Sequence, residues 1–444
     1  MVSVFIPKET HAGENRVAAT PDTVKQLVKK GVKVVIQAGA GLNSHFSDDD
    51  YKALGATIEP EREKGLAQAD LVMQINIPDA ATINGIREGG SLISFLWAFE
   101  NLDAVKKLNE RKISMFAMDA IPRTSRAQKD DALSSQANLA GYKAVIVAAN
   151  HLHKILPMMM TPSGTIKPSR FVIIGVGVAG LQAIATAKRL GAIVEATDPR
   201  PETKEQAESL GAKFLMVEGV EVKKGTGGYA AEQSDEYKKA QAELLAKAFK
   251  NADAIITTAL IPYRPAPKTI SAEHVRSMKP GSVIVDLAAE RGGNCELTEP
   301  GKTVIKEGVT LVGDLNWPST VGVHASEMYS RNVLNILLDS LTKEGELKWD
   351  YKDDIVDGAM VCHQGEVHHP KVRELMGLPP LQKEESKPAE SGKQEPGAQA
   401  TGSQTEPAKG AEQSKADAGA TPASAGNAAA DDYARKPDGY EKKE

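Results

Sequence analysis

Residues 171–180 read FVIIGVGVAG, a hydrophobic run that passes directly into the glycine pattern G-x-G-x-x-G at 175–180. The run predicts a buried strand of a parallel sheet, and the Ala-rich residues 181–190 predict the helix that follows it. The next hydrophobic run ends in an acid, Asp198. A strand, a glycine turn, a helix, a second strand and an acid in this order are typical of a βαβ unit that binds a dinucleotide.

The three glycines meet different physical demands. Gly175 permits the tight turn, Gly177 lets the backbone approach a pyrophosphate, and Gly180 allows the helix to pack closely on the strand. The pyrophosphate would meet the free N–H groups at the start of the helix. Asp198 is placed to accept hydrogen bonds from ribose hydroxyls, and a carboxylate there repels a 2′-phosphate, which favours NAD(H) over NADP(H). The cofactor contacts predicted here are Gly175, Gly177, Val178, Gly180, Asp198, Pro199 and Arg200.

Further hydrophobic runs on both sides of this unit predict an α/β fold with two Rossmann-like domains. Both sheets are expected to be open and mostly parallel, and a long helix over 132–153 is expected to link them. Predicted strands lie at 2–6, 32–36, 71–75, 92–96 and 114–118 in the first domain. In the second domain they lie at 171–174, 193–197, 213–216, 254–258, 283–287 and 310–312.

The predicted first domain comprises residues 1–131 and is completed by about 320–378, because an amphipathic helix over 325–341 returns to it. Residues 132–319 form the predicted NAD(H)-binding domain. Beyond them, residues 382–444 contain no Leu, Ile, Val, Met, Phe or Trp. Such a segment cannot bury enough apolar surface to offset the entropy of ordering. We therefore expect a disordered polar tail over 379–444.

Composition narrows the class of protein. The chain has 444 residues, a net charge of −5 and a hydrophobic content of 41%, which suits a soluble globular protein and argues against a nucleic-acid binder. No secretory signal and no run of about 18 apolar residues occurs, so we expect a cytoplasmic protein without direct membrane insertion. The three methionines at 158–160 are expected in the core. We expect no metal, because Cys362, His363, His368 and His369 match no standard ligand spacing.

Residues 121–138, between the two domains, read IPRTSRAQKDDALSSQAN. The Arg, Gln, Asp and Ser side chains of this polar loop could hold a carboxamide and a ribose. A solvated loop followed by a helix cap would have the same composition. Composition therefore leaves both interpretations open.

At this loop the sequence resembles a known family. PKET at 7–10 with ENRVA at 14–18 resembles the start of the alanine dehydrogenase and nicotinamide nucleotide transhydrogenase superfamily, and residues 38–56 fit it. The polar loop is similar to the NAD(H)-binding domain I of proton-translocating transhydrogenase. MMMTPSGTI at 158–166 and GTGGYA at 225–230 agree with it. The resemblance covers residues 1–378.

The resemblance implies that the polar loop grips the nicotinamide end of NAD(H). The residues that it places at the reacting ring are Arg123, Gln128, Asp131 and Ser134, with Thr124, Ser125 and Arg126 beside them. A mobile loop that closes over the nucleotide and two later positions supply further implied contacts: Gly228, Tyr229, Gln241 and Leu260. Asp130 departs from the family pattern, in which an apolar residue stands beside Asp131.

Alanine dehydrogenases share this architecture but need a cation for the substrate carboxylate and a general acid or base. At the positions resembling their catalytic Lys, His and Asp, this sequence has Gln74 and Asn76, Trp97, and Glu290. Transhydrogenation passes hydride directly between two nicotinamide rings, roughly 3–3.5 Å apart at the reacting atoms, and needs no base. An alanine dehydrogenase-like oxidoreductase and a non-catalytic NAD(H)-binding protein remain the alternatives.

The second nucleotide is expected from elsewhere, because one G-x-G-x-x-G with its strand and acid is found. In the family, NADP(H) is bound by a separate domain, joined through a membrane domain that conducts protons. The resemblance thus implies partner subunits that carry these domains, a homodimer of this chain, and a peripheral position on the inner face of the cell membrane.

Overall fold

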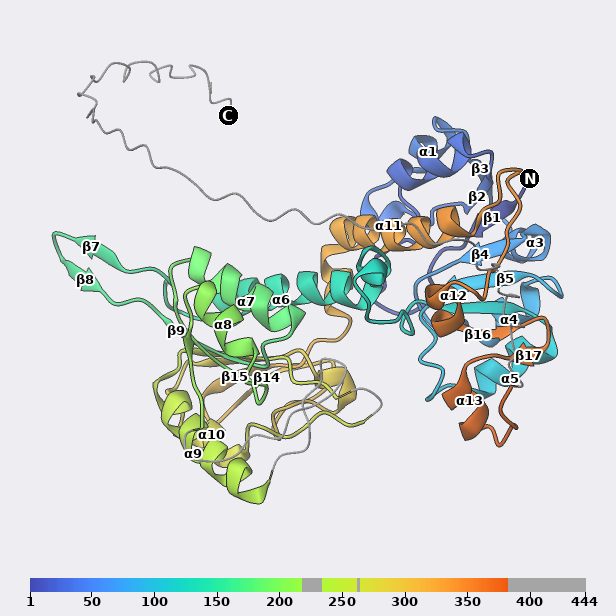
Figure 1. Cartoon of the computed structure of the whole chain (residues 1–444). Coiled ribbons are helices and arrows are strands. Elements are labelled where there is room, and N and C mark those ends of the chain that lie inside the picture. The colour runs from blue at the N-terminus through green and yellow to red at the C-terminus, as the bar shows by residue number, and fades with distance from the viewer. Residues whose placement is uncertain (218–233, 262–263, 382–444) are drawn as a thin grey trace, which may run out of the picture. The chain divides into compact units, whose positions relative to one another are not determined.

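The computed structural model describes residues 1–217, 234–261 and 264–381. Two large, mostly parallel sheets dominate these residues, and helices cover both faces of each (Figure 1). Parallel sheets are covered on both faces because the crossover helices lie there. The predicted α/β class with two open, mostly parallel sheets is confirmed.

The first sheet has eight strands in the order β17-β16-β6-β5-β4-β1-β2-β3. Its strand β1 (Ser3–Ile6) turns Val4 and Ile6 toward one core and Phe5 toward the other. The remaining strands are β2 (Lys33–Gln37), β3 (Thr57–Glu59), β4 (Leu71–Met73), β5 (Ser91–Ser94), β6 (Ser114–Ala117), β16 (Met360–His363) and β17 (Glu366–Val367). The helices around it are α1 (Pro21–Lys29), α2 (Asp48–Lys52), α3 (Arg62–Gln68), α4 (Ala80–Gly85), α5 (Leu102–Glu110), α12 (Asp354–Ala359) and α13 (Pro370–Leu375).

The second sheet has seven strands in the order β11-β10-β9-β12-β13-β15-β14. Its strand β9 (Arg170–Ile174) is paired in parallel with β10 (Ile193–Thr197) and β12 (Ala254–Thr257). The others are β11 (Lys213–Phe214), β13 (Val283–Asp286), β14 (Thr303–Lys306) and β15 (Val309–Val312). Its helices include α7 (Val178–Arg189), α8 (Thr203–Ser209), α9 (Asp235–Asn251) and α10 (Ala272–Ser277).

The sequence patterns located the longer strands and missed the short ones. The structure adds β3 and β14, and the antiparallel strands β16 and β17 extend the first sheet beyond β6. It also adds the hairpin of β7 (Met159–Thr161) and β8 (Gly164–Ile166). The expectation that the methionines at 158–160 are core residues is wrong, because their exposed fractions are 61%, 44% and 75%. Two strands of three residues cannot shield such side chains.

Two long helices, α6 (Ala132–His151) and α11 (Gly322–Ser340), organise the two cores. Ala132 lies in a core of the first sheet, whereas Ala144 and Ala148, farther along the same helix, lie in a core of the second. The predicted linking helix is thus present. Leu334 and Leu337 of α11 pack into the first core, as their spacing predicts. Among the described residues, none of the helices has both the length and the apolar character needed to cross a membrane.

Helices α6 and α7 lie side by side at a contact that excludes any side chain (Figure 1). A Cβ atom added to Gly141 in α6 would lie 2.0 Å from the carbonyl oxygen of Ala179 in α7. That distance is far inside van der Waals contact and involves backbone, which cannot move away cheaply. Gly141 is therefore required by packing, although glycine weakens a helix by about 1 kcal/mol relative to alanine.

The substitution Gly141→Ala is expected to destabilise the fold by about 1–3 kcal/mol or more, because overpacking outweighs the gain in helix propensity. Thermal unfolding checks this. Gly358→Ala in α12 is the matched control, since its Cβ would meet Pro122 at an ordinary 3.4 Å. An unfolding midpoint of Gly141→Ala equal to that of the control would contradict the packing argument.

Candidate nucleotide-binding site

The glycine turn lies between β9 and α7, where the chain needs a conformation that few residues adopt. Gly175 has a φ of 90°, and a Cβ there would lie 2.6 Å from the hydroxyl of Thr258. A Cβ on Gly180 would lie 1.9 Å from the carbonyl oxygen of Gly175. Both glycines are therefore required by the protein's own packing, as the pattern predicts.

Gly177 differs from its two neighbours, because a Cβ there would meet no atom within 4 Å. It is the N-cap residue of α7, and no side chain among the described residues caps this helix end. The first backbone N–H groups of α7 thus face open space. Free N–H groups and the positive end of the helix dipole suit a phosphate, so the turn fits the pyrophosphate of a dinucleotide.

The turn stands at the topological switch point of the second sheet. From β9 the chain builds β10 and β11 on one side and then β12 and β13 on the other. Open α/β sheets bind ligands at the carboxyl ends of the strands where the order reverses. Leu260, a predicted contact, follows β12 at this edge and is 47% exposed. The fold therefore brings Leu260 to the same edge as the glycine turn.

Asp198 follows β10 at the same edge, and its carboxylate is already engaged. Val176 N donates to Oδ2 at 2.7 Å, so the carboxylate holds the glycine turn in place. Arg200 adds three hydrogen bonds of 2.7–2.9 Å from its backbone and guanidinium groups. Tyr237 of α9 is buried, and the nearby Asp198 charge raises its pKa after burial itself, the larger cause. The pairing of Asp198 with Arg200 was not predicted from the sequence.

The polar loop contains the short helix η2 (Arg126–Asp130) and ends at the start of α6. Asp131 is the N-cap residue: it accepts hydrogen bonds from Ser134 N at 2.9 Å and Ser134 Oγ at 2.6 Å. Two of the four residues predicted at the reacting ring thus cap α6 together. The loop residues that the structure leaves exposed are Arg123, Thr124, Ser125, Arg126 and Gln128.

Arg126 is bound to the protein itself. Its guanidinium pairs with Asp353 and Asp354 at the start of α12, with one hydrogen bond to Asp353 at 2.9 Å. No pattern along the chain connects positions so far apart. In this conformation Arg126 therefore fastens the polar loop to the first domain.

Helix α6 carries the polar loop to the glycine turn. Ser134 and Gly141 are seven residues apart on α6, which corresponds to about 10 Å along the axis. Because Gly141 contacts Ala179 in the turn's own helix, the two predicted halves of the site are joined by one rigid element. A span of about 10 Å is short enough for one dinucleotide to reach both.

Three further predicted contacts are placed less directly. Gly228 and Tyr229, with the loop that they represent, lie outside the described residues. Gln241 lies in α9 and is half-buried. Within the described ranges, no group of three or more His, Cys, Asp or Glu side chains could hold a metal ion.

A buried polar network that the sequence did not predict lies beside α6. Arg16 forms a paired interaction with Glu14, from Nε to Oε1 at 2.8 Å and from Nη2 to Oε2 at 2.7 Å. Arg16 also donates to Gln136 of α6 at 2.9 Å and to Asn316 at 3.2 Å. Glu14 accepts in turn from Asn316 at 2.9 Å and from Asn76 at 3.0 Å. The motif at 14–18 thus links the first domain to α6 and to the chain before α11.

The positions compared with alanine dehydrogenases have structural partners here. Asn76 binds Glu14 and Glu9, and Glu290 accepts a hydrogen bond from the backbone of Asn316. The guanidinium of Arg291 lies 5.2 Å from the ring centre of Trp97. None of these compared positions carries a Lys or His that could move a proton.

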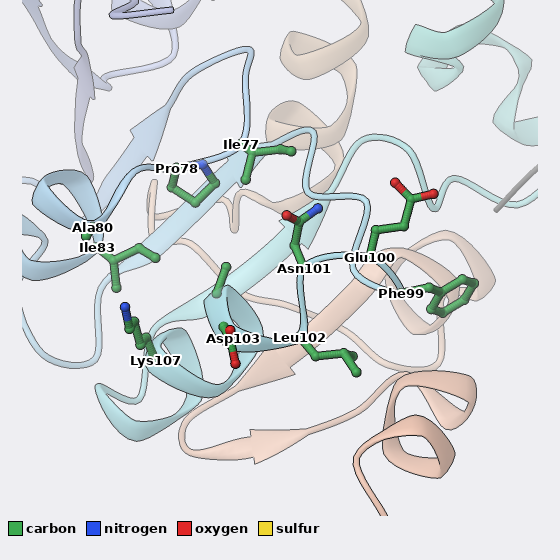
Figure 2. Close-up of a pocket in the computed structure, with 11 residues that line it drawn as sticks. Ile77, Pro78, Ala80, Ile83, Phe99, Glu100, Asn101, Leu102, Asp103 and Lys107 are labelled. Carbon is green, nitrogen blue, oxygen red and sulfur yellow. The ribbon is translucent and has the colours of Figure 1, made fainter. Parts of the chain in front are cut away.

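A cavity of about 430 Å³ lies on the first domain, at the ends of α4 and α5 (Figure 2). Ile77, Pro78 and Leu102 line it, and Glu100 at its edge pairs with Arg291. None of the predicted cofactor contacts lines this cavity. It is therefore separate from the candidate nucleotide site.

Removing the Glu14 charge is expected to destabilise the fold by about 3–5 kcal/mol, because Arg16 would remain buried without its counter-charge. Glu14→Gln and chemical unfolding test this. Burial, the largest single effect, would raise the pKa of Glu14, but the hydrogen bonds and charge of Arg16, with Asn316 and Asn76, lower it to about 2.

The ordinary value is 4.5, so the contribution of Glu14 is complete above that pH and is lost as the pH falls toward 2. Glu14→Gln should lack this component of the acid sensitivity. The double variant Glu14→Leu with Arg16→Met is the control, because an apolar pair removes both charges and should recover much of the stability. Equal losses in the single and double variants would contradict the ion-pair argument.

Comparison with known proteins agrees with this geometry. The family models for the N-terminal and C-terminal domains of alanine dehydrogenase/PNT match residues 5–140 and 144–370. An NAD(P) transhydrogenase subunit alpha chain of Rhodospirillum rubrum is 48% identical over 377 residues, covering 83% of this chain and 98% of the relative. An alanine dehydrogenase of Mycobacterium tuberculosis is 32% identical over 300 residues, covering 67% and 75%.

A crystal structure of transhydrogenase from Sinorhizobium meliloti superimposes with a TM-score of 0.75 at 43% identity, covering 82% of this chain and 99% of that one. Similarity thus extends over nearly the whole length of a transhydrogenase alpha subunit chain, at a higher identity than to the alanine dehydrogenase. The chain belongs to the alanine dehydrogenase/PNT family, among the NAD(P) transhydrogenase alpha subunits.

Proposed function

We propose that this chain binds NAD(H) across the glycine turn and the polar loop and exchanges hydride with NADP(H) held by a partner subunit. The observation that carries the proposal is the single helix α6, which begins at the polar loop and contacts the glycine turn through Gly141. One end of the nucleotide would be held by its pyrophosphate and the other by its carboxamide and ribose.

The chain's own residues would bind and orient the nucleotide. Gly177 and the uncapped start of α7 would hold the pyrophosphate, and Asp198 would accept from the adenosine ribose through its remaining lone pairs. The nicotinamide end would be held by the polar-loop residues Arg123, Gln128, Asp131 and Ser134. NAD(H) supplies the hydride, so orientation is the demand on the protein and no proton needs to move.

The buried network supports hydride exchange over amino-acid oxidation. A substrate carboxylate would need the cation of Arg16, but Glu14, Gln136 and Asn316 already accept four hydrogen bonds from that guanidinium. A general acid or base would need a Lys or His, whereas Asn76 and Trp97 stand at the compared positions. An amino acid would therefore find neither of the groups that it requires.

The partner follows from the chemistry. Hydride exchange needs two nicotinamide rings in contact, and the glycine turn accounts for one nucleotide. The relatives' names describe an alpha subunit, which supports a complex with further subunits. We place NADP(H) and the proton-conducting membrane domain on those subunits, with this chain held peripherally at the inner face of the membrane and coupled to proton translocation.

Mixing the full chain with the NADP(H)-binding component of a transhydrogenase should produce rapid hydride exchange between NADH and thio-NADP⁺, which absorbance follows. Gly177→Val is the matched variant, because its side chain would fill open space in the free protein and block the pyrophosphate. It should weaken NADH binding roughly a hundredfold, equivalent to about 2.8 kcal/mol, and leave the melting temperature unchanged.

NADH binding without exchange would overturn the proposal in favour of a non-catalytic NAD(H)-binding protein. NADH oxidation that depends on pyruvate and ammonia would overturn it in favour of an alanine dehydrogenase. The full chain without the NADP(H)-binding component serves as the blank.

We also propose that two copies of this chain associate through the hairpin β7–β8. The hairpin extends away from the second sheet and exposes Met158, Met160 and Ile166 (Figure 1). An isolated two-stranded hairpin is marginally stable in water. Burying these apolar side chains against a second copy would stabilise both the hairpin and a dimer.

Met160→Glu is expected to convert a dimer into monomers, because it places a charge in the apolar contact. Sedimentation velocity of the full chain gives the mass. Ile305→Glu is the control, since Ile305 is 74% exposed on the edge strand β14 of the second sheet. A wild-type monomer, or a dimer that survives Met160→Glu, would contradict the proposed contact.

A further inference from the structure

The polar loop contains a fully buried acid. Asp130, the last residue of η2, has an exposed fraction of 0%. Among the described residues, neither of its carboxylate oxygens has a hydrogen-bond partner. Its neighbour Asp131, by contrast, accepts two hydrogen bonds from Ser134. A buried carboxylate without donors is strongly disfavoured in its ionised form.

The residues around Asp130 hold the loop against α11. Lys129 Nζ pairs with Asp339 of α11 at 2.6 Å. The Lys129 carbonyl accepts from Nδ2 of Asn332 at 2.8 Å and of Asn335 at 3.0 Å, both on α11. Together with the Arg126 pairs at α12, these contacts form a clamp that can close only if Asp130 is buried.

The charges that face Asp130 are engaged elsewhere. On η2 the cations are Lys129 and Arg126, and on the packed elements the anions are Asp339 and Asp353. Each belongs to one of the ion pairs of the clamp. Burial, the largest effect, raises the pKa of Asp130 from its ordinary 3.8 to about 6, and the two cations only partly offset it.

We propose that Asp130 is a positioning residue of the NAD(H) site: its neutral form lets the clamp close, and its ionisation loosens the polar loop's grip on the nicotinamide end. The proposal rests on the proposed nucleotide site. It gives a function to a carboxyl group in an unfavourable place, whereas the charged groups Arg126 and Lys129 beside it are paired.

The sign of the pH dependence follows from linkage. The closed clamp binds the Asp130 proton more tightly than the released loop, in which the carboxyl would meet water at its ordinary pKa. Closing is therefore favoured at low pH and weakens as the pH rises, until Asp130 is ionised in both states above about pH 6. With these values the closing equilibrium falls about tenfold between about pH 5 and about pH 7.5.

Amide hydrogen exchange of residues 123–131 in the nucleotide-free full chain tests the clamp directly. After correction for intrinsic exchange, protection in the wild type should fall about tenfold over this pH range. Asp130→Asn and Asp130→Ala should remove this dependence, because neither side chain ionises. Asp357→Asn is the charge-matched control on α12, where Asp357 is exposed, and it should behave as the wild type.

NADH affinity over the same pH range gives the second readout, with the same fall of about tenfold in the wild type and none in the Asp130 variants. A wild-type loop with pH-independent protection, or Asp130 variants that keep the wild-type dependence, would overturn the proposal. If NADH fails to bind at any pH, the proposed function fails, and amide exchange still decides the role of Asp130.

Discussion

The contact between Gly141 in α6 and the Ala179 carbonyl in α7 is the constraint on which the nucleotide site depends. Helix α6 starts in the core of the first sheet and ends in the core of the second, so a shift at this contact would move both. The polar loop precedes α6, and the glycine turn precedes α7. A glycine in mid-helix therefore sets the distance between the two halves of the site, and the packing gain outweighs its low helix propensity.

The buried pair of Glu14 and Arg16 acts at the same boundary. It connects the N-terminal segment to Gln136 on α6 and to Asn316 before α11. Because both charges are richly hydrogen-bonded, the pair can remain ionised inside the protein. The same bonds occupy the cation that an amino-acid substrate would need. Structural order and substrate exclusion thus come from one set of contacts, which suits a protein whose proposed reaction needs two oriented rings and no proton transfer.

The two adjacent aspartates at the end of the polar loop show how finely local geometry sets an electrostatic environment. Asp131 faces the start of α6 and accepts from Ser134, whereas Asp130 faces the interior and accepts from no group in the described chain. The loop is held by ion pairs on either side of Asp130. A carboxyl group in that place couples the conformation of the loop to protonation.

The sequence by itself determined the βαβ unit, the two sheets and the linking helix. These features depend on local periodicity and on glycines whose requirement is local, since Gly175 and Gly180 are needed by the turn itself. It also placed the polar loop before α6. The family resemblance supplied the assignment of that loop, which residue spacing did not. Only the tertiary structure decided which polar side chains the protein uses for itself. Arg126 pairs with Asp353, 227 positions away, and Asp198 pairs with Arg200 and the glycine turn. Gly141 looks like any helical glycine until α7 packs against it, and the methionines at 158–160 look like core residues until the hairpin exposes them. Burial and pairing depend on partners brought together by packing, and a sequence pattern records only near neighbours along the chain.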